Sequence, residues 1–128
     1  MGRVLAAGLL VALLAVPSAG ATTSYAFGRQ GGSIRPFAVT IASNGTVHAV
    51  GAVQPSRRIV PSATLARLDR LAAQVRLGAL PGLTRCSGTL PDIATQWIRT
   101  GNRTVEVHGG CSPRFARFWQ ALTTAVGL

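Results

Sequence analysis

The chain has 128 residues, with 13 arginines, no lysine and three acidic residues, so its formal net charge is +10. This length suits one small domain and excludes a protein built from several. Two histidines and three acidic residues leave little material for acid–base catalysis or for a metal site.

The N-terminus has the features of a secretory signal peptide. Arg3 precedes an apolar run from Val4 to Val16, and the small residues Ala19–Gly20–Ala21 follow. The apolar run is shorter than the roughly 20 residues that cross a bilayer, which disfavours a membrane anchor. We therefore expect residues 1–21 to be a signal peptide cleaved after Ala21. The remainder, residues 22–128, is expected to be one secreted α+β domain with no transmembrane segment.

Export affects the interpretation of the two cysteines, Cys86 and Cys111. In an oxidising compartment, two cysteines of a small domain most simply pair with each other. The alternative is a catalytic thiol or a redox pair, which the absence of a C-x-x-C spacing disfavours. The prediction is a disulfide that closes a loop of about 26 residues and stabilises the fold by roughly 3.5 kcal/mol.

The first half of the remaining chain predicts three strands. Residues 22–29 indicate a short edge strand, residues 37–42 a half-buried strand, and residues 47–53 its return strand after the turn at Asn44–Gly45. A two-residue turn would place His48 opposite Ile41 on the apolar face. A turn with a glycine bulge would instead place Val47 opposite Ile41 and direct His48 outward. We favour the second register because it buries valine and leaves the imidazole in water.

A helix is predicted over residues 63–77, with Ser62 as its cap and Gly78 at its end. The helix is amphipathic, with an apolar stripe on one side and polar residues on the opposite side. The stripe consists of Leu65, Leu68, Ala72 and Val75, with Leu71 beside it. Residues 79–91, with two prolines and two glycines, indicate a structured loop.

A second hairpin is predicted from residues 94–99 and 104–108 around Gly101–Asn102, which suits a type II′ turn. In that register Ile98 faces Val105 and Gln96 faces Val107. A last helix begins with Ser112 and Pro113 and ends at Gly127. Its apolar face consists of Phe115, Phe118, Trp119, Leu122 and Val126.

Together these elements predict an α+β fold with one disulfide. The sheet is expected to be antiparallel, with about five strands from two hairpins and an N-terminal strand. Both amphipathic helices are expected to cover one face of the sheet, which leaves the other face open to a partner.

The order of elements resembles a family of small exported or lipid-anchored bacterial α+β domains of unknown function. The resemblance rests on the Gly-rich turn, the strand Pro36–Ile41, the turn Asn44–Val47, a helix, a Pro-Asp segment and a helix started by proline. It covers most of residues 22–128 and implies the same fold class, with no activity attached. Many such proteins have cysteines in the Gly-rich turn, whereas residues 31–35 of this chain have none.

The predicted outer face of the second hairpin is the best candidate for a binding patch. A tryptophan beside an arginine on a surface is typical of an interaction hot spot. The patch consists of Thr95, Trp97, Arg99, Glu106 and His108. In the rival interpretation the register shifts by one residue, Trp97 enters the core and no patch forms.

No catalytic motif is present, and no cofactor or metal is expected. A hydrolase or metal-dependent enzyme would have to use Asp92, Glu106 and His108, and nothing in the sequence sets their separation. A metal site from His48, Glu106 and His108 is conceivable, but polar residues that share a strand face usually just meet solvent.

The favoured function is therefore binding, by a secreted basic domain at the cell envelope. Removing Arg3 with the signal peptide leaves 12 arginines against three acids, a net charge of +9. Such a surface attracts an anionic envelope polymer or an acidic protein. Dedicated nucleic-acid binding is disfavoured, because the aromatic residues are few and do not alternate with the arginines.

Overall fold

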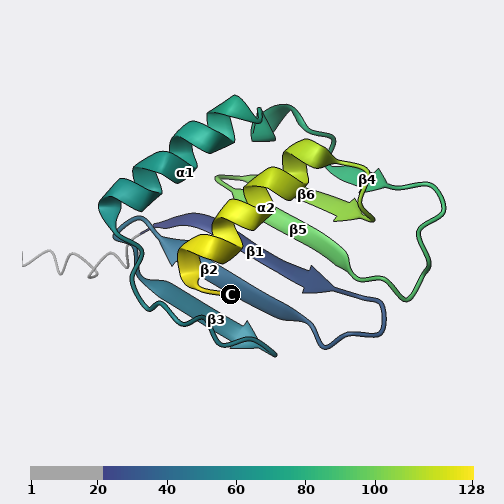
Figure 1. The fold of residues 1–128 in the computed structure, drawn as a ribbon, viewed down its shortest axis with the longest axis horizontal. Helices are drawn as coiled ribbons and strands as arrows, with labels where there is room; N and C mark the ends of the chain where they lie inside the picture. The colour runs from purple at the N-terminus through teal and green to yellow at the C-terminus, as the bar shows by residue number, and fades with distance from the viewer. Residues whose placement is uncertain (1–21) are drawn as a thin grey trace, which may run out of the picture.

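The structure, a computed structural model, describes residues 22–128, so the predicted signal peptide (1–21) lies outside the described residues. These residues form a six-stranded sheet and two helices (Figure 1). In chain order the elements are β1 (Thr23–Gln30), β2 (Phe37–Ala42), β3 (Val47–Gly51), α1 (Ser62–Gln74), the 3-10 turn η1 (Leu77–Ala79), β4 (Leu83–Arg85), β5 (Thr95–Thr100), β6 (Arg103–His108) and α2 (Pro113–Val126).

The strand order is β3-β2-β1-β5-β6-β4, so the two predicted hairpins join through β1. β1 pairs with both β2 and β5 and lies inside the sheet, which corrects the prediction of a short edge strand. Its alternating Tyr25 and Phe27 are buried beneath the helices, as an interior strand requires.

The sheet is mixed, whereas five antiparallel strands were predicted. The sixth strand, β4, pairs in parallel with β6, and backbone bonds from Glu106 N to Gly82 O and from Cys86 N to His108 O flank it. A strand of three residues is too short to show alternation. It forms because β6 offers it an edge with unpaired backbone groups.

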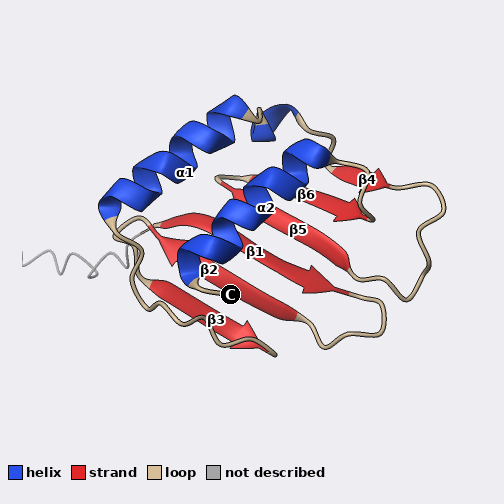
Figure 2. Ribbon diagram, in the orientation of Figure 1, coloured by secondary structure: helices blue, strands red, loops and turns tan. Residues whose placement is uncertain are grey.

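The α+β class is confirmed, but the predicted placement of both helices on the sheet is only partly right. Figure 2 shows α2 lying across one face of the sheet, with α1 beside α2 and running in the opposite direction. The packing contacts of α1 are chiefly with α2 rather than with the strands. The physical reason is the narrower apolar face of α1, of which Leu68 is the one fully buried residue.

The ends of α1 also differ from the prediction. The helix begins at Ser62, with Pro61 at the capping position and no side-chain cap bond, and it ends at Gln74. Arg76 rather than Gly78 adopts the left-handed conformation, with φ of 51°. This early turn directs Leu77 into the core, where it is 1% exposed.

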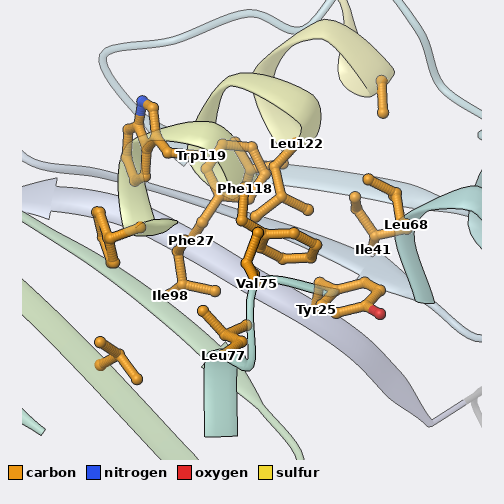
Figure 3. Packing of buried hydrophobic residues seen from close by; sticks show 14 of the residues in the cluster. Tyr25, Phe27, Ile41, Leu68, Val75, Leu77, Ile98, Phe118, Trp119 and Leu122 are labelled. Carbon is orange, nitrogen blue, oxygen red and sulfur yellow. The ribbon is translucent and has the colours of Figure 1, made fainter. Parts of the chain in front are cut away.

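The core is one cluster between α2 and the sheet, closed on one side by α1 and η1 (Figure 3). The predicted apolar face of α2 is confirmed, because Phe115, Phe118, Trp119, Leu122 and Val126 are all buried. Trp119 meets Phe27 of β1 edge-on, with ring centroids 5.4 Å apart. Such edge-to-face aromatic pairs stabilise the fold beyond the effect of the area that they bury.

The favoured register of the first hairpin is confirmed, and of the two registers left open for the second hairpin the structure has the unshifted one. Val47 pairs with Ile41 and His48 is exposed, because Gly45, with φ of 88°, forms the bulge. In the second hairpin Ile98 pairs with Val105, and Gln96 pairs with Val107. The turn glycine, Gly101, has the positive φ that the predicted turn requires.

The predicted disulfide between Cys86 and Cys111 is confirmed, with an S–S distance of 2.00 Å. It ties the end of β4 to the segment that leads into α2. Gly109 lies against it with φ of 112°, and a Cβ there would meet the side chains of Cys86 and Thr89. Only glycine fits this position without strain.

Candidate functional site

The face of the sheet opposite α2 is not covered by either helix, and we call it the open sheet face. Strand pairing places all five residues of the predicted patch on it, because Trp97 pairs with Glu106 and Arg99 with Thr104. The neighbouring Ile98 is fully buried on the other face. Trp97 itself is half-buried, so it is not a core residue, as the rival register would have made it.

Four polar side chains from four neighbouring strands form a row across this face. Gln30 pairs with Thr95, and Arg85 pairs with His108. Because Gln96 pairs with Val107, Thr95 lies beside His108. We call Gln30, Thr95, His108 and Arg85 the polar row. Adjacent strands lie about 4.8 Å apart, so a ligand of modest length can touch all four.

Two members of the polar row, Gln30 and Arg85, were missed in the sequence. Their position depends on the pairing of β1 with β5 and of β4 with β6. No local signal places β1 beside β5. The sequence predicts a loop over the residues that form β4.

Hydrogen bonds orient several side chains of the open sheet face. Gln30 Nε2 donates to Glu106 Oε1 over 2.8 Å, and His108 Nε2 lies 2.9 Å from the Ile93 carbonyl oxygen. A carbonyl only accepts, so Nε2 is the protonated ring nitrogen in this bond. Arg99 Nε donates to Thr104 Oγ1 over 3.0 Å.

Gln30, Glu106 and His108 lie in a shallow hollow of about 380 Å³, which we call the polar hollow. Its polar lining consists of Gln30, Arg85, Thr95, Glu106 and His108, and Leu83, Pro91 and Ile93 contribute apolar walls. The hollow combines hydrogen-bond acceptors with one guanidinium. Such a site can take a ligand rich in hydroxyl groups that also has a negative charge.

Trp97 lies over Gly28 of β1. A Cβ at Gly28 would lie 2.8 Å from Trp97 Cζ2, so any larger residue would displace the indole. Beside the indole is a second hollow of about 350 Å³, the apolar hollow, to which Pro36, Ala38 and Val50 also contribute. Gln30 lines both hollows, so they adjoin on one face.

The residues of the alternative enzyme do not converge. Glu106 and His108 line the polar hollow, but Asp92 lines a separate hollow together with Gln96, which pairs with the buried Val107. Within residues 22–128, no three His, Cys, Asp or Glu side chains are grouped so that they could hold a metal ion. His48 lies on β3, and three strands, β2, β1 and β5, separate β3 from β6.

The side of the protein formed by the two helices is rich in exposed arginine. Five exposed arginines lie on it, and we call them the arginine layer: Arg67, Arg70, Arg76, Arg114 and Arg117. The single acidic residue of the two helices, Asp69, accepts a hydrogen bond from Tyr25 over 2.5 Å. Burial, followed by this bond, raises the pKa of the Tyr25 hydroxyl well above its usual value. Tyr25 therefore stays neutral and is a structural residue.

No family model matches the chain, and neither a curated protein nor a solved structure shows significant similarity to it. Within residues 22–128, no helix combines the length and the apolar character that crossing a membrane would require. Function must therefore be argued from the geometry and the charge of the described residues.

Proposed function

We propose that this protein is an exported binding module that takes an anionic partner at the cell envelope, either an acidic polymer or an acidic protein. The observation that carries the proposal is the imbalance of charge. Residues 22–128 contain 12 arginines and three acidic residues, so at least nine arginines have no acidic side chain to neutralise them. A surface of this kind attracts polyanions over about a Debye length, roughly 10 Å at 0.1 M salt.

Five of the 12 arginines belong to the arginine layer, and the two helices contain one acidic side chain, Asp69. An extended polyanion that approaches the helices therefore meets five guanidinium groups and one carboxylate. Arg114 has a structural role as well, because it donates to the carbonyl oxygens of Val75 and Arg76. Arg70 and Arg117 are exposed residues suited to mutation.

Export is the second part of the proposal, with cleavage after Ala21. The disulfide supports it, because such bonds persist in oxidising compartments and are rare in the cytosol. The signal-like N-terminus supports it independently. We do not favour the hydrolase, because Asp92 lines a different hollow from Glu106 and His108.

Chromatography on immobilised polyphosphate tests the charge part. We expect the exported protein to elute at a salt concentration well above that of neutral proteins. The double variant Arg70→Gln/Arg117→Gln should elute at lower salt than the parent, since two contacts with the polymer are lost.

The matched control is Arg35→Gln/Arg99→Gln, which removes the same charge from residues outside the helices. It should shift the elution less. Elution of the parent together with neutral proteins would contradict the proposed affinity. An equal shift for both variants would contradict the role of the arginine layer.

A further inference from the structure

The open sheet face lies opposite the helices and has a different chemistry from the arginine layer. Along it run the polar hollow and the apolar hollow, which share Gln30. The first combines acceptors with a guanidinium, and the second has an indole beside small apolar residues. A ligand that spans both must therefore offer hydroxyl groups, an apolar surface and a negative charge.

We propose that the open sheet face binds an acidic oligosaccharide, with a carboxylate on Arg85 and the apolar face of a sugar ring on Trp97. This inference rests on the function proposed above and adds the chemical class of the anionic partner. The open sheet face that recognises this partner is separate from the arginine layer.

The acceptors of the polar hollow call for hydroxyl donors. Glu106 accepts from Gln30 through Oε1, which leaves Oε2 to accept from a ligand, and the Gln30 carbonyl oxygen can accept as well. With Nε2 of His108 donating to the Ile93 carbonyl oxygen, Nδ1 is the ring nitrogen left for a hydroxyl group of the ligand. Thr95 adds a hydroxyl that can donate or accept. Sugar hydroxyl groups can donate to all of these atoms.

Arg85 provides the charge selectivity. It is exposed, lines the polar hollow and pairs with His108, and no hydrogen bond within residues 22–128 engages its guanidinium. A guanidinium binds a carboxylate through two parallel hydrogen bonds. The ligand should therefore have a carboxylate on the sugar placed over β4 and β6.

Trp97 provides the apolar contact. Its indole lies over Gly28 and lines the apolar hollow with Pro36, Ala38 and Val50, and Val50 is 53% exposed. The C–H groups on one side of a sugar ring pack on an aromatic ring, whose face is electron-rich. The two hollows together extend across all six strands, from Val50 on β3 to Arg85 on β4, which suits several linked sugars.

Calorimetry with three probes tests the proposal on the full exported protein. The probes are a linear oligogalacturonate, its carboxyl-reduced neutral counterpart, and poly-glutamate of similar charge. We expect saturable binding of oligogalacturonate, weaker binding of the neutral saccharide and weaker binding of poly-glutamate. Trp97→Ala should weaken oligogalacturonate binding by at least about tenfold. Arg85→Gln should remove the preference for the carboxylated over the neutral saccharide.

Two further variants keep the result interpretable. Trp97→Phe retains an aromatic face and should keep most of the affinity, while it removes the fluorescence change that ligand causes at Trp97. The second tryptophan, Trp119, is 8% exposed and serves as the internal reference for folding. Arg70→Gln/Arg117→Gln should weaken the binding of oligogalacturonate and of poly-glutamate alike, because the arginine layer attracts any polyanion, and should leave the preference for the saccharide intact.

Three results would overturn the inference. The first is no saturable binding of either saccharide. The second is binding of poly-glutamate with equal affinity and the same dependence on Trp97 and Arg85, which would assign the face to an acidic peptide. The third is loss of the preference for the saccharide over poly-glutamate on substitution of Arg70 and Arg117 alone, which would assign recognition of the saccharide to the arginine layer and leave the proposed anionic function in place.

Discussion

Tyr25 is the single tyrosine of the chain, and its hydroxyl connects β1 to α1 through the 2.5 Å hydrogen bond to Asp69. Burial of the phenol and the nearby carboxylate both disfavour the tyrosinate, so the pKa is raised above its usual value of 10.0 in the folded state. In the unfolded chain the hydroxyl returns to its usual pKa. Tyr25 therefore contributes stability that is fully present below pH 10 and is lost as the pH rises above it.

The prediction is that tyrosinate forms only as the protein unfolds in alkali. The near-ultraviolet absorbance of tyrosinate should rise together with the loss of the circular dichroism signal. In Tyr25→Phe, this alkaline loss of stability should be absent, and the free energy of unfolding at neutral pH should fall by about 1 kcal/mol. Titration of the tyrosine near its usual pKa with the fold intact would contradict this account.

The two helices lie side by side in opposite directions, and one side chain joins the start of α2 to the end of α1. Arg114 in the first turn of α2 donates from Nε to the Val75 carbonyl over 2.6 Å and from Nη2 to the Arg76 carbonyl over 3.0 Å. These carbonyls lie where α1 ends, at the negative end of its dipole. The guanidinium therefore replaces the cap that Gly78 was predicted to provide.

Substituting Arg114 should accordingly destabilise the fold. We expect Arg114→Met to lower the free energy of unfolding by about 1–2 kcal/mol, because bonds from a charged donor to the helix end are lost. Arg117→Met, in the same helix and also exposed, should have an effect within about 0.5 kcal/mol. Urea unfolding monitored by circular dichroism measures both. Similar losses in the two variants would show that charge, rather than capping, matters here.

The disulfide connects the parts of the protein that the sheet alone leaves weakly joined. Cys86 follows β4, the short edge strand, and its backbone amide donates to His108 at the end of β6. Cys111 lies two residues before the start of α2. The crosslink therefore holds β4, the polar row and the start of α2 in one arrangement.

Removing it should affect both stability and the polar row. We expect Cys86→Ser/Cys111→Ser to lower the free energy of unfolding by about 3.5 kcal/mol, since the unfolded chain regains the entropy of an open loop. Amide hydrogen exchange of Arg85 and Cys86 should rise more than that of β1. Mass spectrometry of exported parent protein should find no free thiol. Uniform exchange across all strands would argue against this local role.

Much of the candidate site was predictable, because a turn between strands that are close in the sequence places its residues on one face. Trp97, Glu106 and His108 share a face because one tight turn at Gly101 sets the register of β5 against β6. The same holds for His48, whose outward position follows from the bulge at Gly45. Gln30 and Arg85 were missed because their neighbours in the row lie far away along the chain.

The sequence by itself determined the disulfide partners, the buried face of α2 and the excess of arginine, and it narrowed the register of each hairpin to two alternatives. Each follows from local geometry, from composition, or from there being only two cysteines to pair. Tertiary structure alone decided that β1 joins the hairpins, that β4 adds a parallel edge, and that α1 packs on α2. Those contacts join segments distant in the chain, and their free energy comes from burying surfaces together, which no local pattern encodes.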